Sequence, residues 1–405
     1  MIMHKVPAGL CAAALLAAGT AFAQLQISGA APEPKGAASF PVGPLNVFPG
    51  IDLAQGYDDN LFWTNNNTKS SAFTVVSPYV RAEAKSGPNK FDATLRLANG
   101  HFWDSSHDNF TDYSLLGNGD LVFDGRTGLK LRAEFRHGHD PRGSTDRAAT
   151  STPDEYNNYG LDGIFRYGAP GAQGRIEIDA GAYARRYTNH HDTTDVSNRN
   201  TWQGGGTFFW RVMPRTEVLI QAQHRNINYT DDSSPGPTQS SAENRYYLGL
   251  KWEPTAKTTG TVKVGYMTKN FDSSAIKDYS GTSWEVGVRW SPLTYSVFDL
   301  ATSRVTNEST GVGNAILSNN YSLTWSHAWS SRLRTQALAG YRHDDFLDSS
   351  PNRVDKTATF GAKVSYDFRR WLLLGAEYTH TDRNSTLNFD DYKRNLFLLT
   401  VGATL

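Results

Sequence analysis

Hydrophobic and polar residues alternate with a period of two along most of the chain, from Asn46 to the C-terminus. Within residues 245–252, for example, Tyr246 and Leu248 share one face while Lys251 lies on the other. Successive side chains of a β-strand point to opposite faces, so this period predicts strands of about 10–14 residues. Helical periodicity is missing from any stretch of useful length after Asn46, and the predicted fold class is therefore all-β.

The apolar face of such strands packs either in the core of a soluble sandwich or against the lipid of a membrane. The predicted strands are long for a sandwich and suit a tilted bilayer crossing, which takes about 9–11 residues. Aromatic residues bracket several apolar stripes, as Trp284 and Trp290 bracket Val286 and Val288. Membrane interfaces favour aromatics at both ends of an apolar band. Both features favour a membrane-spanning sheet.

The connections between the predicted strands alternate between short turns and long polar loops. We count eight short and nine long connections, which predicts about eighteen strands with both chain ends on the short-turn side. Short periplasmic turns and long extracellular loops are typical of antiparallel outer-membrane β-barrels. In lipid, a sheet satisfies its backbone only by closing. Residues 391–405, with Phe397 and Leu399 on one face, supply the closing strand.

The first residues predict export, which together with the barrel pattern predicts a location in the bacterial cell outer membrane of a Gram-negative cell. Lys5 precedes an apolar run that ends near Ala-Phe-Ala, the pattern of a signal peptide (residues 1–23) cleaved after Ala23. Residues 24–45 are rich in Ala, Gly and Pro and predict a periplasmic lead-in, so the barrel is expected over residues 46–405. The expected partners are outer-membrane lipids and lipopolysaccharide. The zero net charge gives no reason to expect nucleic acid.

Asp58, Asp59 and Asn60 follow the first predicted strand and raise the question of a catalytic site. A similar arrangement, an aromatic residue followed by Asp, recurs where other outgoing strands end, as at Phe271 and Asp272. This recurrence favours the beginning of a hydrated outer loop over a reaction centre.

The first strand and its exit, "FPGIDLAQGYDDNLFWTNNN", and a second strand that contains Ser77 and Pro78 resemble the opening of the putative beta-barrel porin 2 family. Members of that family are wide outer-membrane barrels that are often associated with the export of exopolysaccharide or capsule. The resemblance implies a polysaccharide conduit that works with periplasmic polysaccharide-export components. It transfers no functional residues to this sequence.

The polar face of a large barrel lines a water-filled lumen, where we expect the function to reside. Charges of both signs on that face either set up a transverse field or neutralise each other across neighbouring strands. Lumen-facing tyrosines would offer sugar rings a stacking surface. The candidate pore-lining residues are Arg96, Arg132, Glu134, Arg136, Arg185, Arg245, Tyr247, Glu285, Arg289 and Arg342.

Two other features bear on chemistry. Adjacent His190 and His191 beside Asp192 resemble a metal-binding group, but neighbouring residues of an extended chain point apart, which favours ordinary surface histidines. His343 and His380 lie near aspartates without a nucleophile motif. We therefore expect no enzyme activity, no cofactor and no metal.

The third outer loop, within residues 137–156, is among the longest. A solvated surface loop is the default expectation for such a segment. The alternative hypothesis is that it folds inward, with Arg142 and Arg147 lining a constriction.

The sequence and the resemblance together predict an outer-membrane porin that serves as a conduit for a secreted polysaccharide. A general or sugar-type diffusion porin for small polar solutes is the main alternative. A structural, adhesive or enzymatic barrel is the third.

Overall fold

The computed structural model describes residues 38–231, 236–255, 257–309 and 311–405. The predicted signal peptide and most of the predicted lead-in lie outside the described residues. Residues 40–42 of the lead-in form a short strand that folds back on the first barrel strand, with Phe40 opposite Val47. The barrel itself begins at Leu45.

The strands share one antiparallel sheet. Their bounds are β1 Phe40–Val42, β2 Leu45–Asp58, β3 Ser71–Ser86, β4 Asn89–Phe102, β5 Phe110–Val122, β6 Thr127–Asp140, β7 Asp154–Tyr167, β8 Gly174–Tyr187, β9 Arg199–Met213, β10 Thr216–Tyr229, β11 Ser241–Thr255, β12 Thr258–Phe271, β13 Tyr279–Leu293, β14 Ser296–Glu308, β15 Ala315–Ala328, β16 Leu333–Leu347, β17 Val354–Arg369, β18 Leu372–Ser385 and β19 Tyr392–Thr404.

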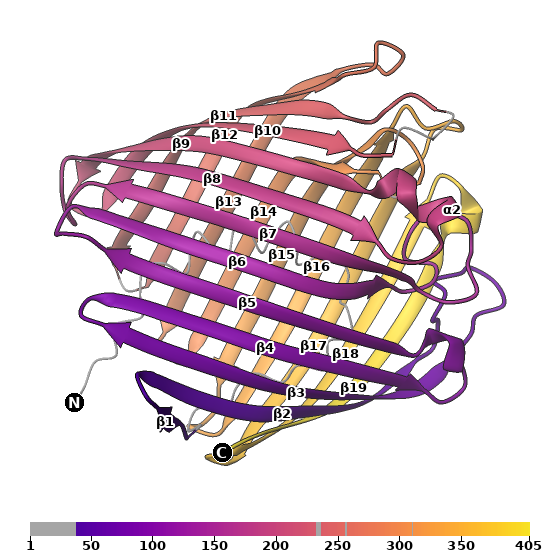
Figure 1. Ribbon diagram of the computed structural model, residues 1–405, viewed down its shortest axis with the longest axis horizontal. Helices are drawn as coiled ribbons and strands as arrows, with labels where there is room; N and C mark the ends of the chain where they lie inside the picture. Colours follow the sequence, from indigo (N-terminus) through magenta and orange to yellow (C-terminus); the bar gives the residue numbers. More distant parts are fainter. Residues whose placement is uncertain (1–37, 232–235, 256, 310) are drawn as a thin grey trace.

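The sheet closes on itself, because β19 pairs with β2 from Leu396 opposite Asp58 to Thr404 opposite Gly50. Closure leaves no open edge in the wall formed by β2–β19, which is what lipid requires of a spanning sheet. The eighteen long strands β2–β19 confirm the predicted barrel (Figure 1). They run to between 13 and 16 residues: twelve of them fall within the predicted 10–14 residues, and six, β3 and β17 among them, are one or two residues longer.

Long loops gather at one end of the barrel and short turns at the other (Figure 1). The long loops carry the short helices α2 (His191–Thr194), η1 (Ser106–Asp108), η2 (Asp195–Ser197) and η3 (Asn388–Asp390). At the opposite, periplasmic end the amide of Ala38 donates to the carbonyl oxygen of Leu405, so both described chain ends lie on the short-turn side, as predicted. Within the described residues, no helix has the length and apolar character needed to cross a membrane.

The two faces of the sheet differ sharply in chemistry. Leu95, Leu248 and Leu399 are more than half exposed and belong to the apolar stripes. On the other face, the Tyr229 hydroxyl on β10 donates to Glu308 on β14 at 2.9 Å, across three intervening strands. Side chains converge in this way only on the concave side of a curved sheet. The polar face is therefore the interior, and the apolar face is the one presented to lipid.

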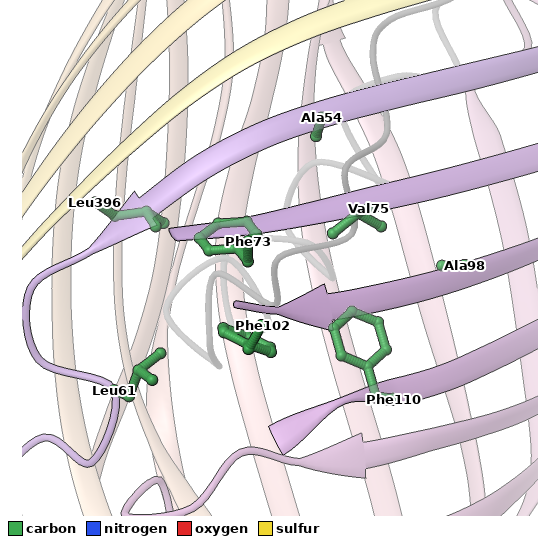
Figure 2. Close-up of a cluster of buried hydrophobic side chains, with 8 residues drawn as sticks. All are labelled: Ala54, Leu61, Phe73, Val75, Ala98, Phe102, Phe110 and Leu396. Carbon is green, nitrogen blue, oxygen red and sulfur yellow. The ribbon is translucent and has the colours of Figure 1, made fainter. Parts of the chain in front are cut away.

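The main apolar cluster lies inside the barrel near the loop end, on the wall made by β2–β5 and β19 (Figure 2). Phe73, Phe102 and Phe110 stack along this wall, with ring centroids 5.2 and 6.4 Å apart. Leu61 from the β2–β3 loop packs onto them, and Phe62 lies beside it. Burial of these two side chains draws the β2–β3 loop inward over the wall.

Candidate pore and outer vestibule

The ten residues predicted to line the pore all lie on barrel strands. Seven of them form ion pairs: Arg96 with Asp52, Arg132 with Glu134, Arg245 with Glu243, Glu285 with Lys263, Arg289 with Asp299, and Arg342 with Asp344. Each partner is on the same strand or within two strands of it. The pairing agrees with mutual neutralisation, one of the two arrangements expected of these charges.

The structure brings two of these candidates into direct contact. The hydroxyl of Tyr247 on β11 donates to Glu285 on β13 at 3.2 Å and also lies 2.7 Å from the hydroxyl of Ser283. Lys263 on β12 completes the group, 2.6 Å from Glu285 and 2.9 Å from Gln221. Arg185 stands apart, with its Nε donating to Asn158 at 2.9 Å and its guanidinium 4.1 Å from the ring centroid of Tyr156. Arg136 shares its strand with Arg132 and Glu134.

Asp58, Asp59 and Asn60 join the first strand to the last. Arg394 on β19 donates to both carboxylate oxygens of Asp58, at 2.5 to 3.1 Å. Asp59 accepts from the backbone and side-chain amides of Asn395, and Asn60 donates to the carbonyl of Lys393. The strand ends at Asp58 and a loop begins, as predicted, but the prediction that this loop start is hydrated was wrong, since Asp58 and Asn60 are 0% and 1% exposed. The pairing of β2 with β19, which we call the seam, has its last backbone pair at Asp58 and Leu396. The side-chain hydrogen bonds of Asp58, Asp59 and Asn60 extend the contact between the two segments beyond that pair.

Asp58→Asn is expected to weaken the seam. The substitution keeps the shape of the side chain but removes the charge that holds the Arg394 guanidinium, which should lower the free energy of unfolding by about 1.5–3 kcal/mol. Thermal unfolding in detergent, followed by the gel mobility of the folded barrel, measures the loss. Asp192→Asn, at an exposed position on α2, is the matched control. Equal melting temperatures for Asp58→Asn and wild type would contradict the role of the seam.

The β6–β7 loop, residues 141–153, folds inward rather than out into solvent. Near its start, Arg142 donates to both carboxylate oxygens of Asp108 on η1, at 2.7 and 2.6 Å. This hydrogen bonding raises the pKa of Arg142 above its ordinary value. The same guanidinium lies 4.3 Å from the ring centroid of Phe62. Gly143 follows with a φ of +79°, and a side chain there would collide with the carbonyl oxygen of Phe62.

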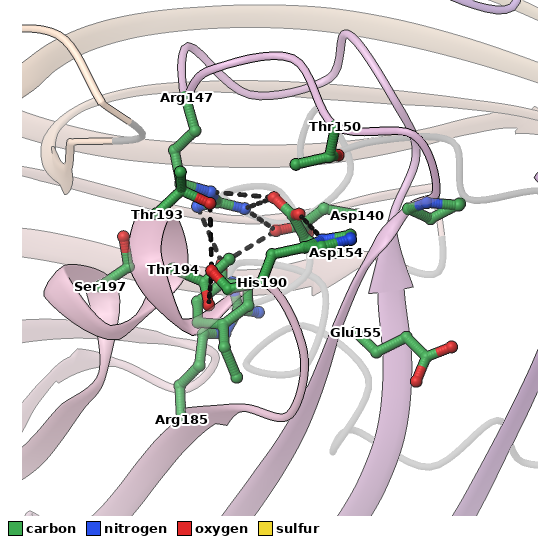
Figure 3. A network of polar contacts seen from close by, with 12 residues as sticks. Asp140, Arg147, Thr150, Asp154, Glu155, Arg185, His190, Thr193, Thr194 and Ser197 are labelled. Carbon is green, nitrogen blue, oxygen red and sulfur yellow. Dashed lines mark hydrogen bonds and ion pairs between the residues drawn. The ribbon is translucent and has the colours of Figure 1, made fainter.

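Arg147 holds the middle of the loop down onto the ends of β6 and β7 (Figure 3). Its guanidinium is 2.8 Å from Asp140 and 2.9 Å from Asp154, and it donates to the Tyr187 hydroxyl at 3.1 Å. Burial opposes the charge of Arg147, but the surrounding Tyr187 and Asp140 raise its pKa on balance. His190 bonds to the other oxygen of Asp154 at 2.8 Å.

The far side of the loop reaches across to the β16–β17 connection. Arg353, which is 2% exposed, is 2.7 Å from Asp146, 2.6 Å from Asp355 and 3.1 Å from Asp390. Gly311 of the β14–β15 loop also touches this loop, since a side chain there would come within 2.7 Å of the Asp146 carbonyl group.

These contacts carry the β6–β7 loop across the outer mouth. The shorter way around the barrel from β6 to β16 passes seven strands, β2–β5 and β17–β19. A loop tied to Asp108 on one side and to Arg353 on the other therefore bridges the opening. The inward-folding hypothesis for this loop agrees with the structure, although Arg142 and Arg147 are occupied by carboxylates rather than free to meet a solute.

A pocket of about 260 Å³ opens beside this bridge, between the β2–β3, β6–β7, β14–β15, β16–β17 and β18–β19 loops. We call it the vestibule pocket. It is lined by Phe62, Trp63, Thr64, Gly143, Thr145, Asp146, Arg147, Val312, Arg353, Arg383, Leu387, Phe389 and Asp390. A larger hollow of about 570 Å³ has walls of mainly apolar side chains such as Leu115, Leu161 and Trp202. These belong to the apolar, lipid-facing stripes, so lipid fills this hollow in a membrane.

His190 and His191 do not share a site. His190 bonds to Asp154, whereas the His191 ring lies 2.9 Å from Asp195. That hydrogen bond to Asp195 raises the pKa of His191. Across the part of the chain that the structure describes, no group of three or more His, Cys, Asp or Glu residues is arranged to hold a metal.

Arg353, Asp390 and Trp63 were not among the residues singled out from the sequence. They lie in loops, where no alternation marks a side chain as inward or outward. Phe389 offered one signal, because a lone aromatic in a polar loop is unusual. Tyr229, at the end of β10, lies inside the barrel and is 7% exposed.

The OpdK protein of Pseudomonas aeruginosa, in a crystal structure with vanillate, is 11% identical, and the match covers 89% of this chain and 99% of that chain with a TM-score of 0.51. A BenF-like porin from Pseudomonas fluorescens Pf-5 is also 11% identical over 89% and 99% of the two chains, with a TM-score of 0.49. The first likeness shows the fold alone. Comparison with curated proteins gives no match. The model of the putative beta-barrel porin 2 family matches residues 33–405, and the chain belongs to that family of outer-membrane porins.

Proposed function

We propose that this porin is a diffusion channel for small polar solutes whose outer mouth is narrowed by the β6–β7 loop. The observation that carries the proposal is the bridge from Asp108 through Arg142 and Asp146 to Arg353. A diffusion porin needs an opening small enough to select solutes by size. A loop held by charge-assisted hydrogen bonds on both sides of the mouth supplies a fixed constriction.

The ten candidate residues then line the channel below the constriction. Seven of them are in ion pairs, so the wall carries charges of both signs close together. Such a wall stays hydrated and gives weak selectivity between anions and cations. Lipids and lipopolysaccharide surround the apolar exterior, and small polar solutes are the partners of the lumen.

Polysaccharide export, implied by the family resemblance, receives no support from the comparisons. A polymer conduit would also require Asp146 of the β6–β7 loop to release Arg353 before a chain could pass. One solved structure with a similar fold, that of OpdK, was crystallised with vanillate, a small solute, which suits the diffusion proposal better.

Planar-bilayer recording and liposome swelling with the purified protein test the proposal. We expect a steady open conductance and entry of small sugars and amino acids, with a sharp loss of permeation as solute size increases. A protein that never conducts would contradict the proposal. So would a strain lacking only this gene that loses surface polysaccharide and accumulates its precursors, because that result requires the export role.

A further inference from the structure

The vestibule pocket combines a small volume with aromatic walls. Its 260 Å³ falls just below the ~300 Å³ at which ordinary ligand pockets begin, so it suits a ligand of one or two rings. On the side of the pocket next to β2 and β19, the two strands that close the barrel, the lining residues include Trp63 from the β2–β3 loop and Phe389 from η3. The pocket therefore opens at the outer end of the seam, beside the loop that crosses the mouth.

Phe389 is unusual in its exposure to solvent, and Trp63 is unusual in its backbone conformation. Phe389 is 75% exposed, so a large apolar ring stands in water at the rim of the pocket. Trp63 has a φ of +53°, which is uncommon for a bulky residue. The ring of Trp63 contacts the ring of Tyr392, with centroids 5.5 Å apart, and the guanidinium of Arg394, 5.2 Å from the Trp63 ring centroid. Strain of this kind persists where the surrounding structure fixes it, and it concentrates at ligand-binding sites.

The charged groups of the pocket already have partners. Arg147 is neutralised by Asp140 and Asp154, which lie outside the pocket lining. Arg353 is neutralised by Asp146 and Asp355. Arg383 lies 3.9 Å from Asp355. Each guanidinium group of the pocket thus faces at least one carboxylate, so an anionic ligand would have to displace an existing ion pair.

One hydrogen-bond acceptor remains open. Oδ2 of Asp390 is buried without a hydrogen bond, although it lies 3.1 Å from Nη1 of Arg353, because the geometry of that approach is poor. Burial raises the pKa of Asp390, while Arg353 and Arg383 act in the opposite direction. A ligand hydroxyl donating to this oxygen would satisfy it without adding charge.

We propose that the vestibule pocket binds a small neutral sugar, a mono- or disaccharide, at the outer mouth. The apolar C–H face of a sugar ring stacks on an aromatic ring, and its hydroxyls bond to ion-paired carboxylates and guanidinium groups without breaking those pairs. Trp63 and Phe389 supply the stacking faces, and Asp390 accepts a hydroxyl. This inference rests on the proposed diffusion function, in which the pocket captures solute ahead of the constriction.

Calorimetric titration of the full-length protein in detergent tests the site without a membrane. With glucose and maltose as probes, we expect saturable binding that is insensitive to salt, since the ligand carries no charge. Phe389→Ala and Asp390→Asn should each weaken that binding about tenfold. Both positions lie in an outer loop. Phe123→Ala, an exposed aromatic in the periplasmic β5–β6 turn, is the matched control and should leave binding unchanged.

Three results would overturn the sugar site: no saturable binding of either probe, equal binding by Phe389→Ala and wild type, or salt-sensitive binding of benzoate in place of sugar. The gel mobility of each folded variant confirms that the barrel is intact. Failure here is distinct from failure of the diffusion function. A conducting protein that binds no sugar rejects the site alone, and a sugar-binding protein that never conducts rejects the channel alone.

Discussion

Replacing residues 142–152 with a short turn is expected to raise the single-channel conductance severalfold. The β6–β7 loop is the segment that crosses the outer mouth, from Asp108 on one side to Arg353 on the other. The barrel strands carry their own hydrogen bonds, so the wall should remain closed when the loop is gone. Planar-bilayer recording of both proteins under identical salt measures the change, and an unchanged conductance would mean that the constriction lies elsewhere.

A point substitution offers the matched version of this experiment. Gly143→Val keeps the length of the β6–β7 loop but adds a side chain that collides with the Phe62 carbonyl, at a residue with a positive φ. The substitution should therefore move the β6–β7 loop away from the β2–β3 loop and raise the conductance. Gly125→Val, in the periplasmic β5–β6 turn where an added Cβ meets nothing within 4 Å, is its control. If both substitutions left conductance at the wild-type value, contact with Phe62 would not position the loop.

Arg353→Met is expected to release the far end of the β6–β7 loop. The substitution leaves Asp146, Asp355 and Asp390 close together without their shared cation, and breaking a buried charge pair costs about 3–5 kcal/mol. Burial works against the charge of Arg353, but Asp355 and Asp146 raise its pKa, so the guanidinium stays charged across the physiological range. Hydrogen exchange over residues 141–153 should accelerate, and conductance should rise.

Two comparisons isolate this effect. Arg126→Met, at an exposed position in a periplasmic turn, should change neither exchange nor conductance. Adding Asp146→Asn and Asp355→Asn to Arg353→Met removes the uncompensated charges, so it should restore much of the lost stability while the loop stays untied. Slow exchange in the Arg353→Met loop would show that other contacts hold the bridge.

The sequence pattern predicts the position of some interior charges but not of others. Arg132, Glu134 and Arg245 lie on the polar face of long alternating strands, so their side of the sheet follows from position alone. Which interior charges pair with one another is harder to predict. The ion pair of Lys263 with Glu285, for example, follows only from the register of β12 against β13. Asp58 shows the limit. Its place at the end of an outgoing strand was predictable, but its bond to Arg394, 336 residues away, was not.

The sequence by itself determined the strands, their number, the alternation of short and long connections, and the side on which both chain ends lie. Each of these is a local property, since a period of two and a turn composition are written in neighbouring residues. Only the tertiary structure decided what happens at the mouth. Asp146 and Arg353 are 207 residues apart and meet because the closed, curved sheet brings opposite loops over one opening. Loop side chains follow no periodic pattern that would predict the direction in which they point. That direction depends on how the closed barrel arranges the loops.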